Sequence, residues 1–238
     1  MLMITPNSLY GRVGAVLSAL IVVAWFVGFT LHSDVYSGIP RKDFFWYYTN
    51  LSNLLVAFYF SVAAPFFYAK RAFRPWIPIA EFSVTMSILL THAVFHMIIF
   101  PGIRPLIQKA DLSGENGMLA VNNLLVHYIV PWLVLLYYLL CAPQKDSVPL
   151  AAAPLWLLFP LSYAAVIFIH AARHQAIPGT ERLYPYPFLD TALLGKRQVL
   201  FTCAGLSLLC ALVSVAVLYV MRALYALYGG NKALFLVG

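Results

Sequence analysis

The sequence predicts an all-α, polytopic membrane protein that forms a single domain over residues 1–238. Of its 238 residues, 63% are hydrophobic and only 10% are charged, which is more apolar surface than a soluble domain of this length buries. The apolar residues are gathered into six long runs. A helix needs about 20 apolar residues to cross a hydrocarbon core roughly 30 Å thick, and unbroken runs of this kind exclude a β-barrel.

The hydropathy of the chain places the membrane-spanning helices in order. We expect them near residues 10–31, 44–69, 77–100, 119–141, 151–170 and 198–227. The first run is too long for the apolar region of a cleaved signal peptide, so we predict a retained helix. The second opens with aromatic residues typical of a membrane interface, and the third ends before Pro101-Gly102. The fourth contains the stretch Leu119–Pro131, and a long loop separates the fifth from the sixth.

The loops differ between the two sides of this arrangement. On the side of the termini they are short, Lys70–Trp76 and Ala142–Pro149. On the other side they are longer: His32–Asp43, Pro101–Gly117 and Ala171–Arg197. Every histidine falls on or near that same side: His32, His92, His96, His127, His170 and His174. Because long ordered loops are commonly functional, we expect the functional site there.

The charges indicate the surroundings of the protein. With a net charge of +7 and its basic residues in loops and at helix ends, the chain suits anionic lipid headgroups, and nothing in it indicates a nucleic acid or a protein partner. Lys and Arg are nearly balanced between the two sides, seven against eight. The short loop with Lys70, Arg71 and Arg74 favours a multi-pass cell-membrane protein with cytoplasmic termini. The cysteines lie in or at the ends of helices, so no disulfide framework is implied.

A tandem repeat is suggested by two local similarities. Residues 52–58 (SNLLVAF) in the second helix match residues 122–128 (NNLLVHY) in the fourth. The pair His92 and His96 in the third helix matches His170 and His174 in the fifth. The second and third helices and the fourth and fifth would then be related hairpins.

Polar residues inside a membrane helix are costly, so those of the second and fourth helices are candidates for function. Thr49 and Asn53 lie four residues apart, as do Asn123 and His127, so each pair occupies one helical face. Thr49 lies roughly 8 Å below the start of its helix and His127 about 12 Å below the start of its own. At similar depths, neutral His127 would take the proton of Thr49 as its hydroxyl attacks a carbonyl. Alternatively, Thr bonds to its own helix, and Asn and His hold neighbouring helices together.

Three motifs resemble those of the androgen-induced and androgen-dependent membrane hydrolases. They are Phe45-Trp-Tyr-Tyr-Thr49, His127-Tyr-Ile-Val-Pro131 and Tyr184-Pro-Tyr-Pro-Phe-Leu-Asp190, and with the six-helix plan they cover nearly the whole chain. The resemblance implies a threonine-dependent hydrolase of lipid esters, such as fatty acid esters of hydroxy fatty acids, without a cofactor. Thr49 would be the nucleophile and His127 the base. Residues Asn50–Asn53 are closer to the bacterial relatives.

The remaining polar residues near this depth are candidates for binding the substrate or stabilising an oxyanion. They are Asn50, Asn53, His92, Asn123, Tyr128, His170, Tyr184, Tyr186 and Asp190. Asp190 is alternatively a cap for the segment before the last helix. No Gly-X-Ser-X-Gly motif is present, which excludes the nucleophile elbow of soluble α/β-hydrolases.

Two other functions remain open. His92, His96, His127, His170 and His174 would form a metal or haem site in a membrane oxidoreductase, because histidines four residues apart on a helix point to one spot. The chain lacks the adjacent-histidine strings of membrane di-iron enzymes. A channel or carrier is disfavoured by the lack of paired charges within the helices.

Overall fold

A computed structural model describes residues 9–33, 41–63, 76–109, 114–142 and 147–228. The described chain is helical and contains no strand, which confirms the all-α prediction. The longer elements are α1 (Leu9–Ser33), α2 (Tyr48–Phe58), α4 (Trp76–Val94), α5 (Phe100–Lys109), α6 (Gly114–Leu124), α7 (Val130–Leu140), η7 (Leu150–Leu157), α8 (Leu158–Ala172) and α10 (Lys196–Tyr228). Short elements join them: η2 (Phe44–Trp46), η3 (Tyr59–Ala63), η4 (Phe95–Ile99), η5 (Leu125–Ile129), η8 (Pro187–Leu189) and α9 (Thr191–Leu194).

Five described helices are long and apolar enough to cross a membrane. They cover residues 12–31, 76–104, 117–140, 150–172 and 196–223. The predicted second span is described only from Tyr48 to Ala63, and its continuation lies outside the described residues. The number of six spans is therefore not confirmed. The cytoplasmic position of the termini stays a prediction, because both termini lie outside the described residues.

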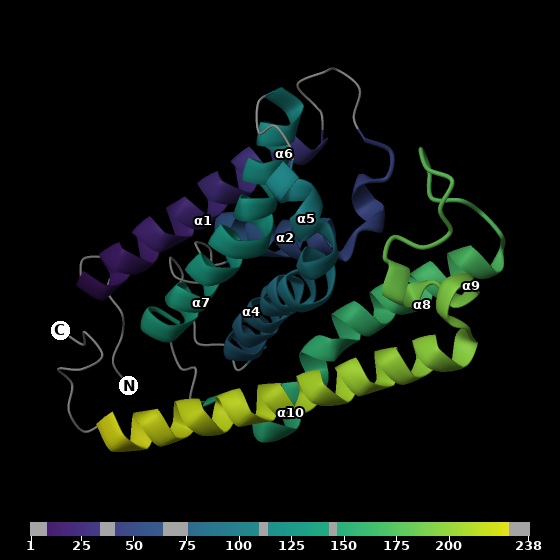
Figure 1. The fold of residues 1–238 in the computed structure, drawn as a ribbon. Coiled ribbons are helices and arrows are strands. Elements are labelled where there is room, and N and C mark those ends of the chain that lie inside the picture. Colours follow the sequence, from purple (N-terminus) through teal and green to yellow (C-terminus); the bar gives the residue numbers. More distant parts are fainter. Residues whose placement is uncertain (1–8, 34–40, 64–75, 110–113, 143–146, 229–238) are drawn as a thin grey trace.

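Helices α1, α2, α4, α6 and α7 form a bundle, and helices α8 and α10 lie beside it as a pair (Figure 1). In the bundle, α1 packs on α6 and α7, and α4 packs on α2 and α7. Its core contains fully buried side chains from four helices, including Ile21, Val56, Phe82 and Val130. The attached pair, α8 and α10, contacts the bundle mainly through η7, which packs on both α4 and α10. A second, smaller core of Tyr48, Ile167, Tyr186 and Leu189 fills the space between pair and bundle.

Three segments of the bundle are π-helical, with wider turns than an α-helix. Each of them, η3, η4 and η5, ends two residues before a proline in the sequence, Pro65, Pro101 and Pro131. A proline has no N–H to donate to the carbonyl oxygen four residues earlier, and its ring clashes with that oxygen. At η4 and η5 the widened turn removes the clash, and the helix continues into α5 and α7. Such π turns often occur at functional sites.

The π turns also explain an error in the prediction of loops. We expected the third span to end at Pro101 and a loop to cover Pro101–Gly117. Instead the helix continues through η4 into α5, and α6 already begins at Gly114. Because η4 accommodates Pro101, this proline occupies the first turn of α5, where a missing N–H costs little.

The tandem repeat is not confirmed. The third span begins as the α-helix α4 and contains the π turn η4 near its end. The fifth span instead begins with the 3₁₀ helix η7 and continues as the uninterrupted helix α8. His96 lies inside η4, whereas His174 lies beyond the end of α8 with a positive φ of 55°.

Candidate functional site

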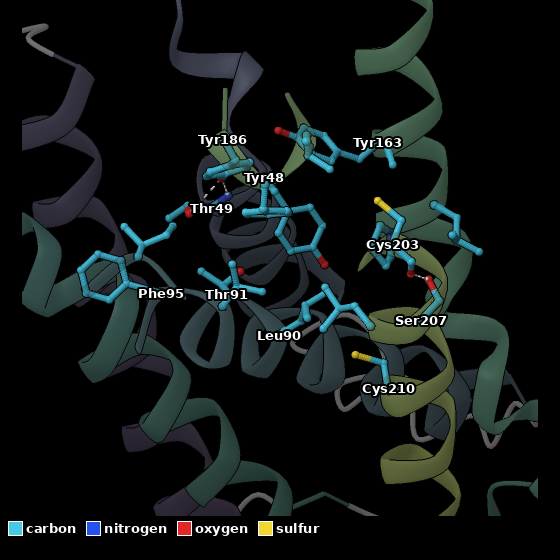
Figure 2. Close-up of a pocket in the computed structure, with 18 of the residues that line it drawn as sticks. Tyr48, Thr49, Leu90, Thr91, Phe95, Tyr163, Tyr186, Cys203, Ser207 and Cys210 are labelled. Atoms are coloured by element: carbon cyan, nitrogen blue, oxygen red, sulfur yellow. Dashed lines mark hydrogen bonds between the residues drawn. The ribbon is translucent and has the colours of Figure 1, made fainter. Parts of the chain in front are cut away.

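A cavity of about 100 Å³ lies between the bundle and the α8–α10 pair (Figure 2). Its walls are mostly apolar, with side chains from α4, η4, η7, α8 and α10. Hydroxyl and thiol groups line it in several places, Thr49 among them, and among the described residues His127 is the histidine that lines it. The structure thus brings the two residues predicted as nucleophile and base to one cavity, although they come from separate helices.

Thr49 is the second residue of α2, and the N-cap of this helix is Tyr47, which has an extended backbone. The first N–H groups of a helix have no partner within it. The Thr49 N–H donates to the hydroxyl oxygen of Tyr186 over 3.3 Å, and the Thr49 Oγ1 lies 3.4 Å from the same oxygen. Tyr186, from the loop before α9, therefore caps the helix that carries Thr49. Figure 2 shows the Thr49 and Tyr186 side chains at one end of the cavity.

Tyr186 is a buried phenol that lines the cavity. Its ring packs edge-on against Tyr47 and stacks on Phe188, at centroid distances of 5.9 and 5.3 Å. Burial raises the pKa of the Tyr186 phenol, because the phenolate would lose its hydration. The hydroxyl is therefore protonated at neutral pH and is a donor next to Thr49.

His127 occupies the π turn η5 and is 7% exposed. Its imidazole stacks on Phe95 of η4, with ring centroids 3.7 Å apart and planes 11° apart. This stacking fixes the plane of the ring, and the cavity is bounded by both side chains. Two neighbouring π turns, η4 and η5, thus shape this side of the cavity.

Asn53 links the backbone segments that carry Thr49 and His127. Its amide nitrogen donates to the Thr49 carbonyl oxygen over 2.9 Å and to the Val126 carbonyl oxygen over 3.2 Å. An amide NH₂ group has two hydrogens, so both are used in these bonds. Asn53 therefore fixes the spacing between α2 and η5, and has no hydrogen left for an oxyanion.

The structure gives several of the other candidates partners away from the cavity. Asn50 donates to the Phe44 carbonyl oxygen over 2.7 Å, which fastens η2 to α2. Asp190 accepts bonds from the Ala192 and Leu193 N–H groups and so caps α9. Asn123 is half-buried on α6 and does not line the cavity.

The remaining candidates have aromatic or hydroxyl partners. The Tyr184 hydroxyl lies 2.8 Å from Thr191 Oγ1, and the Tyr128 hydroxyl lies 3.0 Å from His96 Nδ1. The His170 ring lies against Trp46, with centroids 4.1 Å apart. None of these three side chains lines the cavity.

The histidines predicted as alternative metal ligands are not arranged as a metal site in the described part of the chain. Within the described ranges, no group of three or more His, Cys, Asp or Glu side chains is arranged to hold a metal ion. His92 and His96 stack on each other at 5.8 Å, whereas His170 packs on η2 through Trp46. The side chain of His32 lies outside the described ones.

Several residues of the cavity were not predicted from the sequence. Thr91 lines the cavity and lies 2.6 Å from the Ser52 hydroxyl, which also donates to the Thr49 carbonyl oxygen over 3.0 Å. Phe95 stacks on His127. On α10, Cys203, Ser207 and Cys210 form the opposite wall (Figure 2). Their spacing of four and three residues puts them on one helical face, a signal that the sequence did contain.

Comparisons with protein-family models, with curated proteins and with solved structures found no match to this chain.

Proposed function

We propose that the protein is a membrane hydrolase of lipid esters in which Thr49 is the nucleophile and His127 the base. The observation that carries the proposal is the cavity, whose mostly apolar walls include both Thr49 and His127. A hydroxyl nucleophile needs a nearby base, and an apolar chamber suits a fatty-acyl chain. The resemblance of the three sequence motifs to the membrane threonine hydrolases suggests the ester chemistry.

In the proposed reaction, the Thr49 oxygen bonds to the ester carbonyl carbon while its proton passes to His127. As negative charge develops on the carbonyl oxygen, this oxygen accepts a hydrogen bond from the Tyr186 hydroxyl. That hydroxyl lies beside Thr49 in the structure. Collapse of this intermediate releases the alcohol, which takes the proton from His127. Water then hydrolyses the acyl-threonine, with His127 again as the base.

The acyl chain lies, in this proposal, along the wall formed by α10. That wall combines Leu206 with the small side chains Cys203 and Ser207, and α8 adds Pro160 and Ala164 to the cavity lining. An apolar cavity of about 150 Å³ admits benzene, so a long chain exceeds the present space. The rest of the chain extends between α8 and α10, which are held to the bundle mainly through η7.

Activity-based labelling tests the proposal. The purified full-length chain is incubated with a fluorescent fluorophosphonate, beside the variants Thr49→Ser, Thr49→Val and His127→Ala. We expect labelling of wild type and Thr49→Ser, and none of Thr49→Val or His127→Ala. Thr91→Val is the matched control, because it removes a hydroxyl from the same cavity and should leave labelling intact.

Undiminished labelling of Thr49→Val would refute the proposal. The oxidoreductase alternative is measured on the same preparation, by elemental analysis and an absorption spectrum. Stoichiometric metal or a haem band, together with no hydrolysis of p-nitrophenyl octanoate, would favour that alternative.

A further inference from the structure

His92 contacts the backbone of the proposed base. Its Nδ1 atom lies 2.7 Å from the carbonyl oxygen of His127. A carbonyl oxygen only accepts hydrogen bonds, so His92 Nδ1 carries a proton and donates. In a regular α-helix this oxygen would accept from the N–H four residues later, but residue 131 is a proline and has none.

The His92 ring is held in place for this bond. It lies edge-on to Tyr128 and Trp132, at centroid distances of 5.1 and 5.5 Å, and stacks on His96. Tyr128 follows His127 directly in η5, and Trp132 follows Pro131 in α7. The ring thus packs on one residue within the widened turn and on one just beyond it, while His92 itself does not line the cavity.

We propose that His92 is a positioning residue for His127. It takes the place of the donor that Pro131 lacks and so stabilises the π turn η5. A π turn contains one residue more than a turn of α-helix. Side chains within the turn and after it therefore point in other directions than they would on a regular α-helix. By holding this turn, His92 keeps the His127 ring against Phe95 and toward Thr49. This inference rests on the proposed function, since it assigns to His127 the role of base.

A variant series separates this role from a general effect on folding. His92→Leu removes the donor, whereas His92→Asn keeps an N–H group near the position of Nδ1. With p-nitrophenyl octanoate as substrate, we expect His92→Leu to lower kcat about tenfold with little change in KM. His92→Asn should retain most of kcat. His170→Leu is the matched control, because it also removes a partly buried imidazole, and that ring packs on Trp46 rather than on η5.

If His92→Leu fails to fold, the pair His92→Asn and His92→Gln decides. The glutamine amide reaches the position of Nε2 rather than Nδ1, so the proposal expects a lower kcat for glutamine than for asparagine. Equal kcat for the two would overturn it, as would an unchanged kcat in a folded His92→Leu. Either result leaves the proposed function intact while Thr49→Val remains unlabelled, whereas a labelled Thr49→Val refutes the function itself.

Discussion

The bundle and the α8–α10 pair differ in how much of their apolar surface is buried within the protein. In an 18-residue apolar stretch of the span 76–104, 50% is buried within the protein. In the corresponding stretch of the span 196–223, only 11% is buried. On α10, Leu200, Leu208 and Leu212 are 68%, 63% and 60% exposed, while Phe82 and Val130 in the bundle are 0% exposed. The proposed reacting groups, Thr49 and His127, belong to the more buried side. The wall proposed for the acyl chain belongs to the more exposed one.

This difference suggests a division of tasks. Reacting atoms need fixed positions, because small displacements are costly to catalysis. A wall for acyl chains of different lengths needs apolar surface and room to move. Substitutions in the bundle site should therefore affect reactivity with every ester, and substitutions on α10 should affect only the choice of chain.

The largest effect is expected at His127. We predict that His127→Gln lowers kcat for p-nitrophenyl octanoate by about 10²–10⁴-fold, because the glutamine amide cannot take the Thr49 proton. Steady-state kinetics of the purified variant measure this. His96→Gln changes an exposed histidine in the neighbouring π turn η4, and its kcat should remain close to that of wild type. A His127→Gln enzyme with wild-type kcat would show that the base lies elsewhere.

A somewhat smaller effect is expected at Tyr186. Tyr186→Phe removes the hydroxyl that lies beside Thr49, and we predict a decrease in kcat of about 10²–10³-fold, as for other donors to an oxyanion. Tyr184→Phe is the control from the same loop, since its hydroxyl pairs with Thr191. Equal activity of the two variants would contradict the role of Tyr186.

On the other wall of the cavity, Ser207→Phe should change selectivity rather than reactivity. The added ring fills space along α10, so we predict that the ratio of kcat/KM for dodecanoyl over butanoyl p-nitrophenyl esters falls about tenfold. Leu208→Phe enlarges the neighbouring residue, which is 63% exposed and lies outside the cavity, and should leave the ratio unchanged. A parallel loss with both esters would instead mean that α10 is part of the reacting site.

The smallest effect is expected at Gly28 of α1, which packs behind η5. A Cβ atom added there would lie 2.9 Å from Val126 Cγ1, next to His127. We predict that Gly28→Ala lowers the free energy of unfolding by about 1–3 kcal/mol through overpacking, and lowers kcat by displacing the turn. Gly205→Ala on α10 is the control, because no atom outside the neighbouring backbone of its own helix lies within 4 Å of the added Cβ. Thermal unfolding and kinetics of both variants test this, and equal stability would contradict the close contact.

Much of the fold followed from the sequence, because long apolar runs leave few alternatives to membrane helices. The predicted limits of the first and last spans, 10–31 and 198–227, lie within two residues of α1 and α10. The continuation of the helix past Pro101 was missed, because a proline in sequence is the usual sign of a helix end. Whether a π turn accommodates it depends on tertiary packing, which periodicity does not reveal.

The candidate site was predicted in part for a similar reason. Thr49 and His127 are polar residues within apolar helices and belong to the motifs that resemble the membrane hydrolases, so the sequence marked them as candidates, and both line the cavity. Their partners were harder to assign, because hydrogen-bonding groups in the sequence do not indicate their direction. Asn53 was expected to bind substrate, whereas its amide joins two backbone segments. Phe95 was overlooked, because an aromatic residue in a membrane helix is ordinary until its neighbour is known.

The central claim is that a covalent bond forms at Thr49, and mass spectrometry tests it most directly. The chain is labelled with a fluorophosphonate, digested, and the modified residue is identified by fragmentation of the labelled peptide. Our account predicts a single modified site, on the Thr49 oxygen. Modification of Ser52, Thr91, Ser207 or a cysteine of α10, with Thr49 unmodified, would contradict it.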